Sequence, residues 1–364
     1  MTMTKPVVAY FGNYPPLYTR VRTTLKGLEK NNIQVIECRH DHPWLWLRLL
    51  ILAFKYLRIA RKVDVLMVAE GGQAHVPLAK ILAKLTKKPL LFDAFLSYYH
   101  VKVIDTKVIK PNSLKGYYYY YLDKLSCALA DLVLLDTDEH IKYFCRTFAL
   151  PKLQFRTLPV GSDEEWFYPR QNDDGPQDKS FIIFLVTSFY PLHGVEYVVK
   201  AAKILESYPD IQFIVVGNGS TRAEVQRLAG SLHLKNIKFR DGVPPYQLPY
   251  LMAGADICLG QFGHTEHTQL VVPAKVYDAL AMAKPIITGR TRAVESSFID
   301  RENIILCPVA DPNALAHAIL LLKNNPALRK KIAKNGYGLF KERFSLAKTG
   351  AQLKTILQEL IKIS

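Results

Sequence analysis

Short apolar runs alternate with helix-length amphipathic stretches through the first 160 residues. The apolar runs are near-continuous in Val, Ile and Leu, which is typical of strands covered on both faces. The predicted strands are Val7–Phe11, Ile33–Cys38, Val65–Val68, Pro89–Asp93, Leu132–Asp136 and Phe155–Leu158, and the predicted helices are Thr19–Lys30, Trp44–Arg61, Ala74–Leu85, Lys115–Ala130 and Asp138–Phe148. This alternation predicts a doubly wound α/β unit with a parallel sheet.

A polar segment, Asp163–Ser180, interrupts the alternation. It contains Pro169, Gly175 and Pro176, residues that commonly mark loops, so we place an interdomain linker there. A second series follows, with predicted strands Phe181–Thr187, Ile211–Val216, Ile237–Arg240, Ile257–Gly260, Pro285–Thr288 and Asn303–Cys307, and predicted helices Val195–Ser207, Thr221–Ser231, Pro245–Ala253, Lys275–Ala283, Asn313–Lys323 and Pro326–Phe344.

The predicted organisation is therefore two Rossmann-like domains. They span residues 1–162 and 181–345, with the linker at 163–180 and a last helix at 346–364 that we expect to pack back on the first domain. Ligands of open α/β sheets bind at the carboxyl ends of the strands. Two such edges facing each other across a cleft suit an enzyme with two substrates.

Composition and charge narrow the class of protein. Of the 364 residues, 49% are hydrophobic and 22% charged, which excludes a disordered chain. The five cysteines are scattered without a CxxC pair, so a disulfide scaffold or cysteine zinc site is not expected and a reducing compartment fits. The net charge is +16, and the first 160 residues hold 24 Lys and Arg against 12 Asp and Glu. That excess predicts an anionic partner for the first domain.

The longest apolar stretch, Trp44–Ala60, is a candidate membrane-surface helix. It is 17 residues long and contains Arg48, Lys55 and Arg58, so it is too short and too charged for a spanning helix. A buried amphipathic helix is the alternative. Further along the chain, lysines at positions 80, 84, 87 and 88 alternate with apolar residues, which favours contact with an anionic bilayer. The segment after Met1 leads directly into a strand, and no signal peptide is expected.

The loop after the first strand is the first candidate site. Gly12 allows a ligand to approach the backbone, and the following helix begins beside Tyr18 and Arg20. The alternative is a proline-rich surface turn with a solvated arginine.

The second domain offers stronger candidates. Pro273 presets a helix start, Lys275 falls in the first turn, and Asp278 lies three residues on, so Lys275 and Asp278 project to one side. A lysine there suits a diphosphate and a carboxylate suits ribose hydroxyls. The alternative is a capped helix with an exposed ion pair. Gly217 and Gly219 follow a strand and expose backbone amides, or form a plain tight turn.

Three further features carry weaker signals. His193 precedes a predicted helix at the end of the second domain's first strand, and Asp93 ends a strand of the first domain; each is a candidate catalytic residue or an ordinary loop residue. His264 and His267 lie on a predicted flexible loop, but no further ligand spacing supports a metal site. The run Tyr117–Tyr121 is expected to serve packing.

These motifs resemble the GT-B glycosyltransferases of family 4, the retaining glycosyl transferases group 1. The resemblance covers nearly the whole chain. It rests on Pro273–Ile287 (PAKVYDALAMAKPII), Val215–Gly219 (VVGNG), Leu158–Pro169 (LPVGSDEEWFYP), Pro191–Glu196 (PLHGVE) and the opening Gly12–Arg20.

The resemblance implies metal-independent transfer of a sugar from a nucleotide diphosphate-sugar to an acceptor hydroxyl, with retained configuration, no cofactor and no bound metal. It implies donor binding by the second domain and binding of a glycan or lipid-linked acceptor by the first, in polysaccharide, glycolipid or envelope glycan synthesis. Together with the charge excess of the first domain, the apolar helix and the lysine-rich stretch, it leads us to expect a cytoplasmic enzyme, peripheral on the inner face of the cell membrane. The implied catalytic residues are Asp93 and His193. The residues expected to contact the acceptor or a phosphate are Tyr18, Arg20 and Ser97. The implied donor-site residues are Gly12, Gly217, Gly219, Leu270, Val271, Val272, Lys275 and Asp278.

The chain also departs from the family pattern. Leu270 stands where the family commonly has the first of two carboxylates, and His193 replaces a lysine of the diphosphate-binding pair. Two alternatives therefore remain, a sugar-nucleotide epimerase and a non-catalytic nucleotide-sugar-binding protein. A nucleic-acid binder has only the charge in its favour, because no recognised nucleic-acid motif is present.

Overall fold

The computed structural model describes residues 6–170 and 180–363, which form two compact units. The first unit combines residues 1–160 with 346–364, and the second comprises residues 161–345. The boundary at Val160 lies two residues before the predicted one, and residues 163–170 of the predicted linker belong to the second unit. Residues 171–179 of the predicted linker lie outside the described residues.

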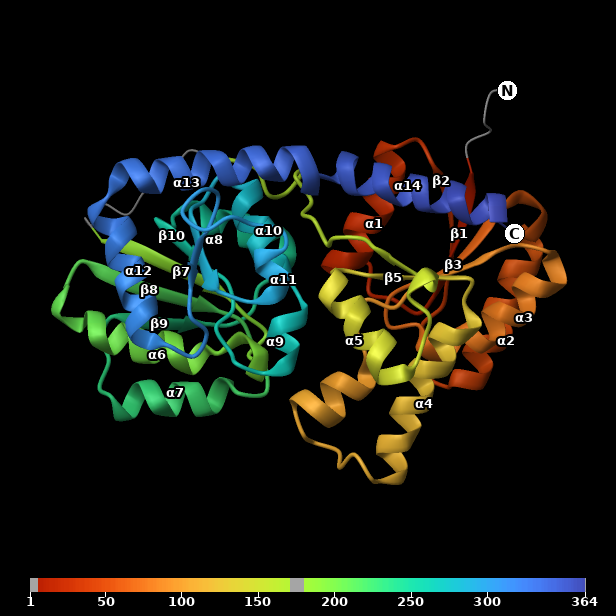
Figure 1. The fold of residues 1–364 in the computed structure, drawn as a ribbon, viewed down its shortest axis with the longest axis horizontal. Helices are drawn as coiled ribbons and strands as arrows, with labels where there is room; N and C mark the ends of the chain where they lie inside the picture. The colour runs from red at the N-terminus through yellow and green to blue at the C-terminus, as the bar shows by residue number, and fades with distance from the viewer. Residues whose placement is uncertain (1–5, 171–179, 364) are drawn as a thin grey trace. The chain divides into compact units, whose positions relative to one another are not determined.

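The first unit contains a six-stranded parallel sheet in the order β2-β1-β3-β4-β5-β6 (Figure 1). Its strands are β1 (Val7–Gly12), β2 (Gln34–Arg39), β3 (Val65–Val68), β4 (Leu90–Asp93), β5 (Leu132–Leu135) and β6 (Phe155–Thr157). Its helices are α1 (Thr19–Lys30), α2 (Leu45–Ile59), η1 (Ala60–Lys62), η2 (Gln73–His75), α3 (Val76–Thr86), η3 (His100–Asp105), α4 (Leu114–Leu129), α5 (Asp138–Phe148), η4 (Lys152–Gln154) and α14 (Leu346–Ile363). The strand order reverses between β1 and β3.

Helix α14 packs on α1, so the end of the chain completes the first core (Figure 1). Two glycines make the approach close: a Cβ on Gly350 would lie 1.9 Å from the Gly27 carbonyl oxygen. Leu353 and Leu357 are buried among the residues of β1 and β3, and Asn31 donates to the Ala347 carbonyl at 3.0 Å. Both helices therefore cover the same face of the sheet.

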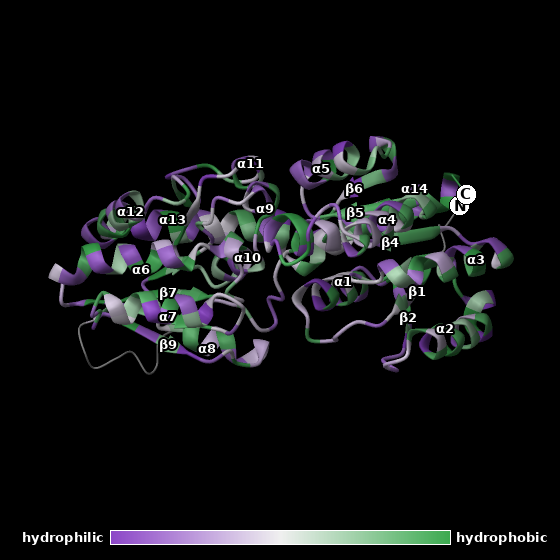
Figure 2. Ribbon diagram, turned by 90° about the horizontal axis from the view of Figure 1, so that it is seen from below, coloured by the Kyte–Doolittle hydropathy of each residue, from purple (hydrophilic) through white to green (hydrophobic). Residues whose placement is uncertain are grey.

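The second unit repeats the architecture with the sheet order β12-β11-β10-β7-β8-β9. Its strands are β7 (Phe181–Val186), β8 (Ile211–Val216), β9 (Ile237–Arg240), β10 (Ile257–Leu259), β11 (Ile286–Gly289) and β12 (Ile305–Cys307). Its helices are η5 (Pro191–His193), α6 (Val195–Ile204), η6 (Leu205–Ser207), α7 (Arg222–Ser231), η7 (Pro245–Gln247), α8 (Leu248–Ala253), α9 (Glu266–Leu270), α10 (Ala274–Ala281), α11 (Arg292–Glu295), α12 (Pro312–Asn324), α13 (Pro326–Leu339) and η8 (Phe340–Phe344). Figure 2 shows α6 and α13 alternating between hydrophobic and hydrophilic colours, as helices on the outside of a sheet do.

Short helices are the main elements that the sequence pattern missed. The predicted flexible loop at His264–His267 contains the start of α9, which Thr265 caps by accepting from the Thr268 amide. The π-helix η3 and the four-residue α11 were also absent from the prediction. Elements this short carry too few apolar positions to show a period. None of the described helices has both the length and the apolar composition needed to cross a bilayer.

Candidate functional site

The carboxyl ends of β7 and β10 meet at the point where the strand order of the second unit reverses. From β7 the chain adds β8 and β9 on one side, and then returns to add β10 on the other. Such a point leaves a crevice outside the strand ends, where ligands of α/β sheets bind. The loops that follow β7, β8 and β10 carry His193, Gly217, Gly219 and, in the next helix, Lys275.

Gly217 and Gly219 allow the loops after β7 and β8 to touch. A Cβ on Gly217 would lie 1.8 Å from the Thr187 carbonyl oxygen, and one on Gly219 would lie 1.7 Å from that of Ser188. Their φ angles, +142° and +157°, are also ones that other residues rarely adopt. Close packing of two backbones therefore explains both glycines without a ligand.

His193 is held in place from two directions. Its backbone carbonyl accepts from Phe262 N at 3.0 Å, and its ring Nδ1 lies 2.9 Å from the Thr187 hydroxyl. Burial, with contributions from the charges of Lys275 and His267, lowers the pKa of His193 well below its ordinary value. The imidazole is therefore neutral at pH 7. The contact of Nδ1 with the Thr187 hydroxyl orients the ring, and Nε2 is the nitrogen that could meet a ligand.

Lys275 is a buried ammonium group in the first turn of α10. Its side chain is 8% exposed, and Nζ has no hydrogen-bond partner among the described residues. Burial lowers its pKa from 10.5 to about 7. An unpaired buried cation is costly, and an anion that reached Nζ would remove that cost. The exposed ion pair with Asp278, one of the two sequence interpretations, is therefore wrong.

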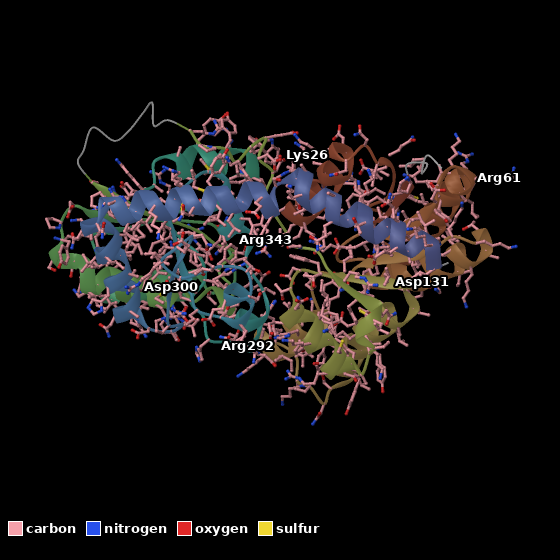
Figure 3. The ribbon with its side chains drawn as sticks, turned by 45° about the horizontal axis from the view of Figure 1, so that its top comes forward. Lys26, Arg61, Asp131, Arg292, Asp300 and Arg343 are labelled. Carbon is pink, nitrogen blue, oxygen red and sulfur yellow. The ribbon has the colours of Figure 1, made fainter. Side chains whose placement is uncertain are left out.

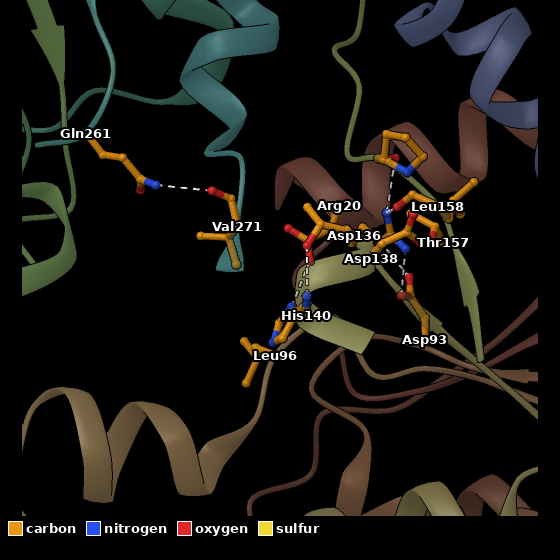
Figure 4. Close-up of polar contacts among 12 residues, drawn as sticks. Arg20, Asp93, Leu96, Asp136, Asp138, His140, Thr157, Leu158, Gln261 and Val271 are labelled. Atoms are coloured by element: carbon orange, nitrogen blue, oxygen red, sulfur yellow. Dashed lines mark hydrogen bonds and ion pairs between the residues drawn. The ribbon is translucent and has the colours of Figure 1, made fainter. Parts of the chain in front are cut away.

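Asp278 is 6% exposed and accepts a hydrogen bond from the Ser162 hydroxyl at 2.6 Å. The segment before α10 is fixed by Gln261, a fully buried residue that follows β10. Its amide donates to the carbonyl oxygen of Thr268 at 3.2 Å. It also donates to the carbonyl oxygen of Val271 at 3.1 Å (Figure 4). Leu270 and Val272 are each 2% exposed and pack inside the unit, so only their backbones are suited to meet a polar ligand.

Arg20 and Asp93 form a buried ion pair at the carboxyl edge of the first unit (Figure 4). Arg20 Nε lies 2.8 Å from Oδ2 of Asp93, and Nη2 lies 2.9 Å from Oδ1. Nη1 donates to the carbonyls of Leu158 and Pro159 at 2.7 and 3.2 Å. Every nitrogen of this guanidinium is occupied within the unit and the side chain is 1% exposed, so the predicted solvated or phosphate-contacting Arg20 does not fit the structure.

Asp93 itself is fully buried, with both carboxylate oxygens on Arg20. This geometry gives it a structural role that the sequence did not predict. Ser97, also 1% exposed, donates to Asp123 at 2.7 Å, so its hydroxyl closes a loop in place of meeting an acceptor. Tyr18, by contrast, is 42% exposed at the same edge, where its ring packs near Phe95.

Metal-binding geometry is absent from the described part of the chain, where no three His, Cys, Asp or Glu side chains converge. The Nδ1 atom of His264 lies 3.2 Å from the hydroxyl oxygen of Tyr197.

Comparison with known proteins identifies the second unit. Residues 169–339 match the family model described as Glycosyl transferases group 1. Those residues are a group 1 glycosyltransferase domain. An uncharacterized glycosyltransferase of Methanocaldococcus jannaschii is 23% identical over 315 residues, covering 85% of this chain and 72% of that protein.

Solved structures confirm the GT-B fold over the whole chain. HepE of Anabaena in complex with UDP superposes with a TM-score of 0.71 at 15% identity, covering 98% of this chain and all of that one. Sucrose-phosphate synthase from Thermosynechococcus elongatus gives a TM-score of 0.73 at 18% identity, covering 99% and 100%. At these identities the similarity establishes the fold and leaves the substrates open.

The sequence prediction missed three residues that the fold brings to the carboxyl edge of the first unit. Glu70 lies two residues after the end of β3. Burial raises the pKa of its carboxyl group to about 7; the negative charge of Asp93 adds to this shift, and the positive charge of Arg20 opposes it. Its place after a strand was a signal available in the sequence. His75 and Arg48, on η2 and α2, gave no such signal because only the tertiary structure brings them to one edge.

The packing of Gly217 can be tested by substitution. Gly217→Ala is expected to lower the free energy of unfolding of the second unit by about 2–4 kcal/mol, because it adds backbone strain and overpacking. Urea denaturation measures the change. Gly230→Ala is the control: its Cβ would meet nothing within 4 Å on α7, so it should stabilise by about 0.5–1 kcal/mol. Equal effects of the two substitutions would refute the packing argument.

Proposed function

We propose that the chain is a retaining, metal-independent transferase that moves a sugar from a nucleotide diphosphate-sugar to a hydroxyl acceptor. The observation that carries the proposal is the unpaired, buried ammonium of Lys275 at the strand-order reversal, beside a neutral His193. A diphosphate supplies the anion that this site lacks. The UDP complex of the Anabaena protein, which shares the fold, supports the same class of donor.

The proposed reaction moves charge toward Lys275. The bond between the sugar's anomeric carbon and the diphosphate oxygen breaks, and that oxygen keeps the electron pair. The acceptor hydroxyl forms the new bond to the same carbon, and its proton passes to the departing phosphate. Lys275 stabilises the developing charge in its ammonium form, and His193 donates or accepts one hydrogen bond. In the proposed complex the Asp278 carboxylate, on the same helix as Lys275, accepts hydrogen bonds from the ribose hydroxyls.

A panel of nucleotide sugars tests this proposal by thermal shift. Ligand that binds the folded state alone raises the melting temperature by mass action, so one donor should stabilise the protein above the others. Product analysis with that donor then separates transfer from epimerisation. No stabilisation by any nucleotide diphosphate-sugar would contradict the proposal.

A non-catalytic nucleotide-sugar-binding protein is the second candidate, and one observation favours it. Leu270 is buried where the family commonly has a carboxylate, so that acidic group is missing from the site. Donor binding without turnover over a broad panel of acceptors would select this alternative.

We further propose that the first unit docks on an anionic membrane, in line with a cytoplasmic enzyme acting on a lipid-linked or polymeric acceptor. One face of α2 exposes Trp46, Leu50, Phe54 and Leu57, each more than half exposed, and α3, which contacts α2, exposes Leu85. Basic residues flank these apolar side chains, namely Arg58, Arg61, Lys62, Lys84, Lys87 and Lys88; Arg61 is labelled in Figure 3. Apolar residues flanked by cations are typical of interfacial helices.

Vesicle flotation tests this membrane proposal. The protein should float with phosphatidylglycerol vesicles at low salt and much less with phosphatidylcholine, and Phe54→Ser should lower the bound fraction several-fold by removing buried apolar area. Leu153→Ser is the control, because Leu153 is 86% exposed on η4, away from α2. Failure of the wild-type protein to float with either lipid at low salt would rule out the docking surface.

A further inference from the structure

His75 is a buried side chain of the first unit whose polar atoms are unused. It lies on η2, after β3, and is 3% exposed. Neither Nδ1 nor Nε2 has a hydrogen-bond partner among the described residues. Buried polar atoms are nearly always paired, so two orphaned nitrogens on one ring call for an explanation.

Arg48 brings a positive charge to this ring from α2. Its Nη1 donates to the His42 carbonyl at 3.1 Å, while its buried Nε has no partner among the described residues. Burial, and after it the charge of Arg48, lower the pKa of His75 to about 4. The imidazole is therefore neutral at pH 7 and offers one N–H donor and one acceptor nitrogen.

Gly12 borders the same place. It ends β1, next to β3 where the strand order of the first unit reverses, and its φ is +141°. A Cβ there would lie 4.0 Å from Nδ1 of His75 and 3.9 Å from the Cβ of Ala69, which is ordinary contact. Tight packing explains Gly217 but not Gly12. The glycine therefore places backbone without a side chain beside His75 at the strand ends, where ligands of α/β sheets bind.

We propose that Arg48, His75 and the Gly12 backbone form a subsite for a phosphate group. Arg48 supplies a charged N–H, His75 supplies a neutral N–H, and a phosphate has enough acceptor oxygens to satisfy both at once. Binding of the anion removes the cost of leaving the two N–H donors, one of Arg48 and one of His75, buried and unpaired. The inference rests on the proposed function in one respect, that the carrier of the phosphate is the sugar acceptor.

Two sources of the phosphate are compatible with this chemistry. Helix α2 carries Arg48 and also the exposed apolar residues Trp46, Leu50 and Phe54, so the phosphate of a lipid headgroup is one source. A soluble phosphate ester is the other. The charge excess of the first 160 residues, 24 basic against 12 acidic, favours an anion in either case.

Histidine-selective 15N NMR of the full chain tests the subsite, with His75→Gln used to assign the ring signals. Inorganic phosphate and glycerol 1-phosphate are titrated at constant ionic strength, and phosphatidylglycerol vesicles form a separate arm. The His75 signals should move, and Arg48→Met should weaken the apparent affinity at least tenfold. In the titrations with inorganic phosphate and glycerol 1-phosphate, Arg58→Met is the matched control on the same helix, because Arg58 lies over the Phe54 ring at 4.1 Å and its loss should leave the affinity for soluble phosphate unchanged.

The outcomes separate the sources and the proposals. A response to the soluble phosphates supports the subsite with a soluble carrier, and a response to vesicles alone supports it with a lipid carrier. No movement of the His75 signals in either arm, or equal affinity in Arg48→Met, overturns it. If circular dichroism shows that Arg48→Met does not fold, His75→Leu replaces it, and phosphate binding is measured by calorimetry. Undiminished phosphate binding by His75→Leu would also overturn the subsite. The nucleotide-sugar panel is measured separately, so either proposal can fail alone.

Discussion

Replacing Lys275 by methionine should abolish stabilisation by the nucleotide sugar while leaving the fold intact. The methionine keeps the apolar stem that packs in the first turn of α10 and removes the ammonium that the diphosphate would meet. A charge-assisted hydrogen bond contributes about 1.5–3 kcal/mol, so the dissociation constant of the donor should rise about 10- to 100-fold. Thermal shift and calorimetry with the best donor of the panel measure this loss.

The same substitution has a signature in the absence of ligand. Burial lowers the pKa of Lys275 to about 7, so the native state loses a proton that the unfolded state keeps up to about pH 10.5. This lysine therefore destabilises the fold fully below pH 7 and progressively less as pH rises toward 10.5. Lys275→Met should raise the free energy of unfolding near pH 7, and this gain should shrink by pH 9.5.

Lys331→Met provides the matched control for Lys275. Lys331 lies half exposed on α13 and pairs with Glu302 at 2.7 Å, so its loss should change neither donor affinity nor the pH dependence. Asp278→Ala should weaken the donor as well, through the lost acceptor for ribose. A donor shift that survived in both Lys275→Met and Asp278→Ala would place the nucleotide sugar elsewhere.

Arg20→Met should be among the most destabilising substitutions in the first unit. It leaves the carboxylate of Asp93 buried without its bidentate partner and frees the Leu158 and Pro159 carbonyls. Breaking a buried pair on one side costs about 3–5 kcal/mol. Urea denaturation followed by circular dichroism should show the transition of the first unit at lower denaturant.

The double variant Arg20→Met/Asp93→Leu separates an ion-pair effect from a packing effect. Removing both charges together should recover most of the lost stability, because no buried charge remains unpaired. Arg156→Met is the control: Arg156 pairs with Glu359 at the surface, 3.2 Å apart, and its loss should cost at most about 1 kcal/mol. If Arg20→Met were as mild as Arg156→Met, the ion pair would not support the fold.

The regular elements followed from the sequence with little error. Helix α5 and strands β8 and β9 have the predicted bounds, and most other elements differ by one or two residues at their ends. Strands covered on both faces are continuous apolar runs, and that pattern is visible without a structure. The helices α9 and α11 were missed because four or five residues do not complete a recognisable period.

The candidate site was only partly visible in the sequence. Loops after the strands could be located, and with them Lys275, Asp278 and His193. The contacts of each side chain could not be predicted, because partners lie far apart in the sequence: Ser162, which donates to Asp278, is 116 residues away from it. Arg20 illustrates the difference: a first-turn arginine beside a glycine loop indicated an anion site, yet its partner is Asp93, 73 residues on.

By itself, the sequence determined two α/β units, their strand ends and the motifs of a group 1 glycosyltransferase, because periodicity and local motifs depend on neighbours along the chain. The tertiary structure decided which charges are paired and which are unpaired. It enclosed Arg20 against Asp93 and left Lys275, Arg48 and His75 with polar atoms that have no partner within residues 6–170 and 180–363. Burial and pairing arise from contacts between distant segments, and those contacts decide whether a charged side chain supports the fold or is available to a ligand.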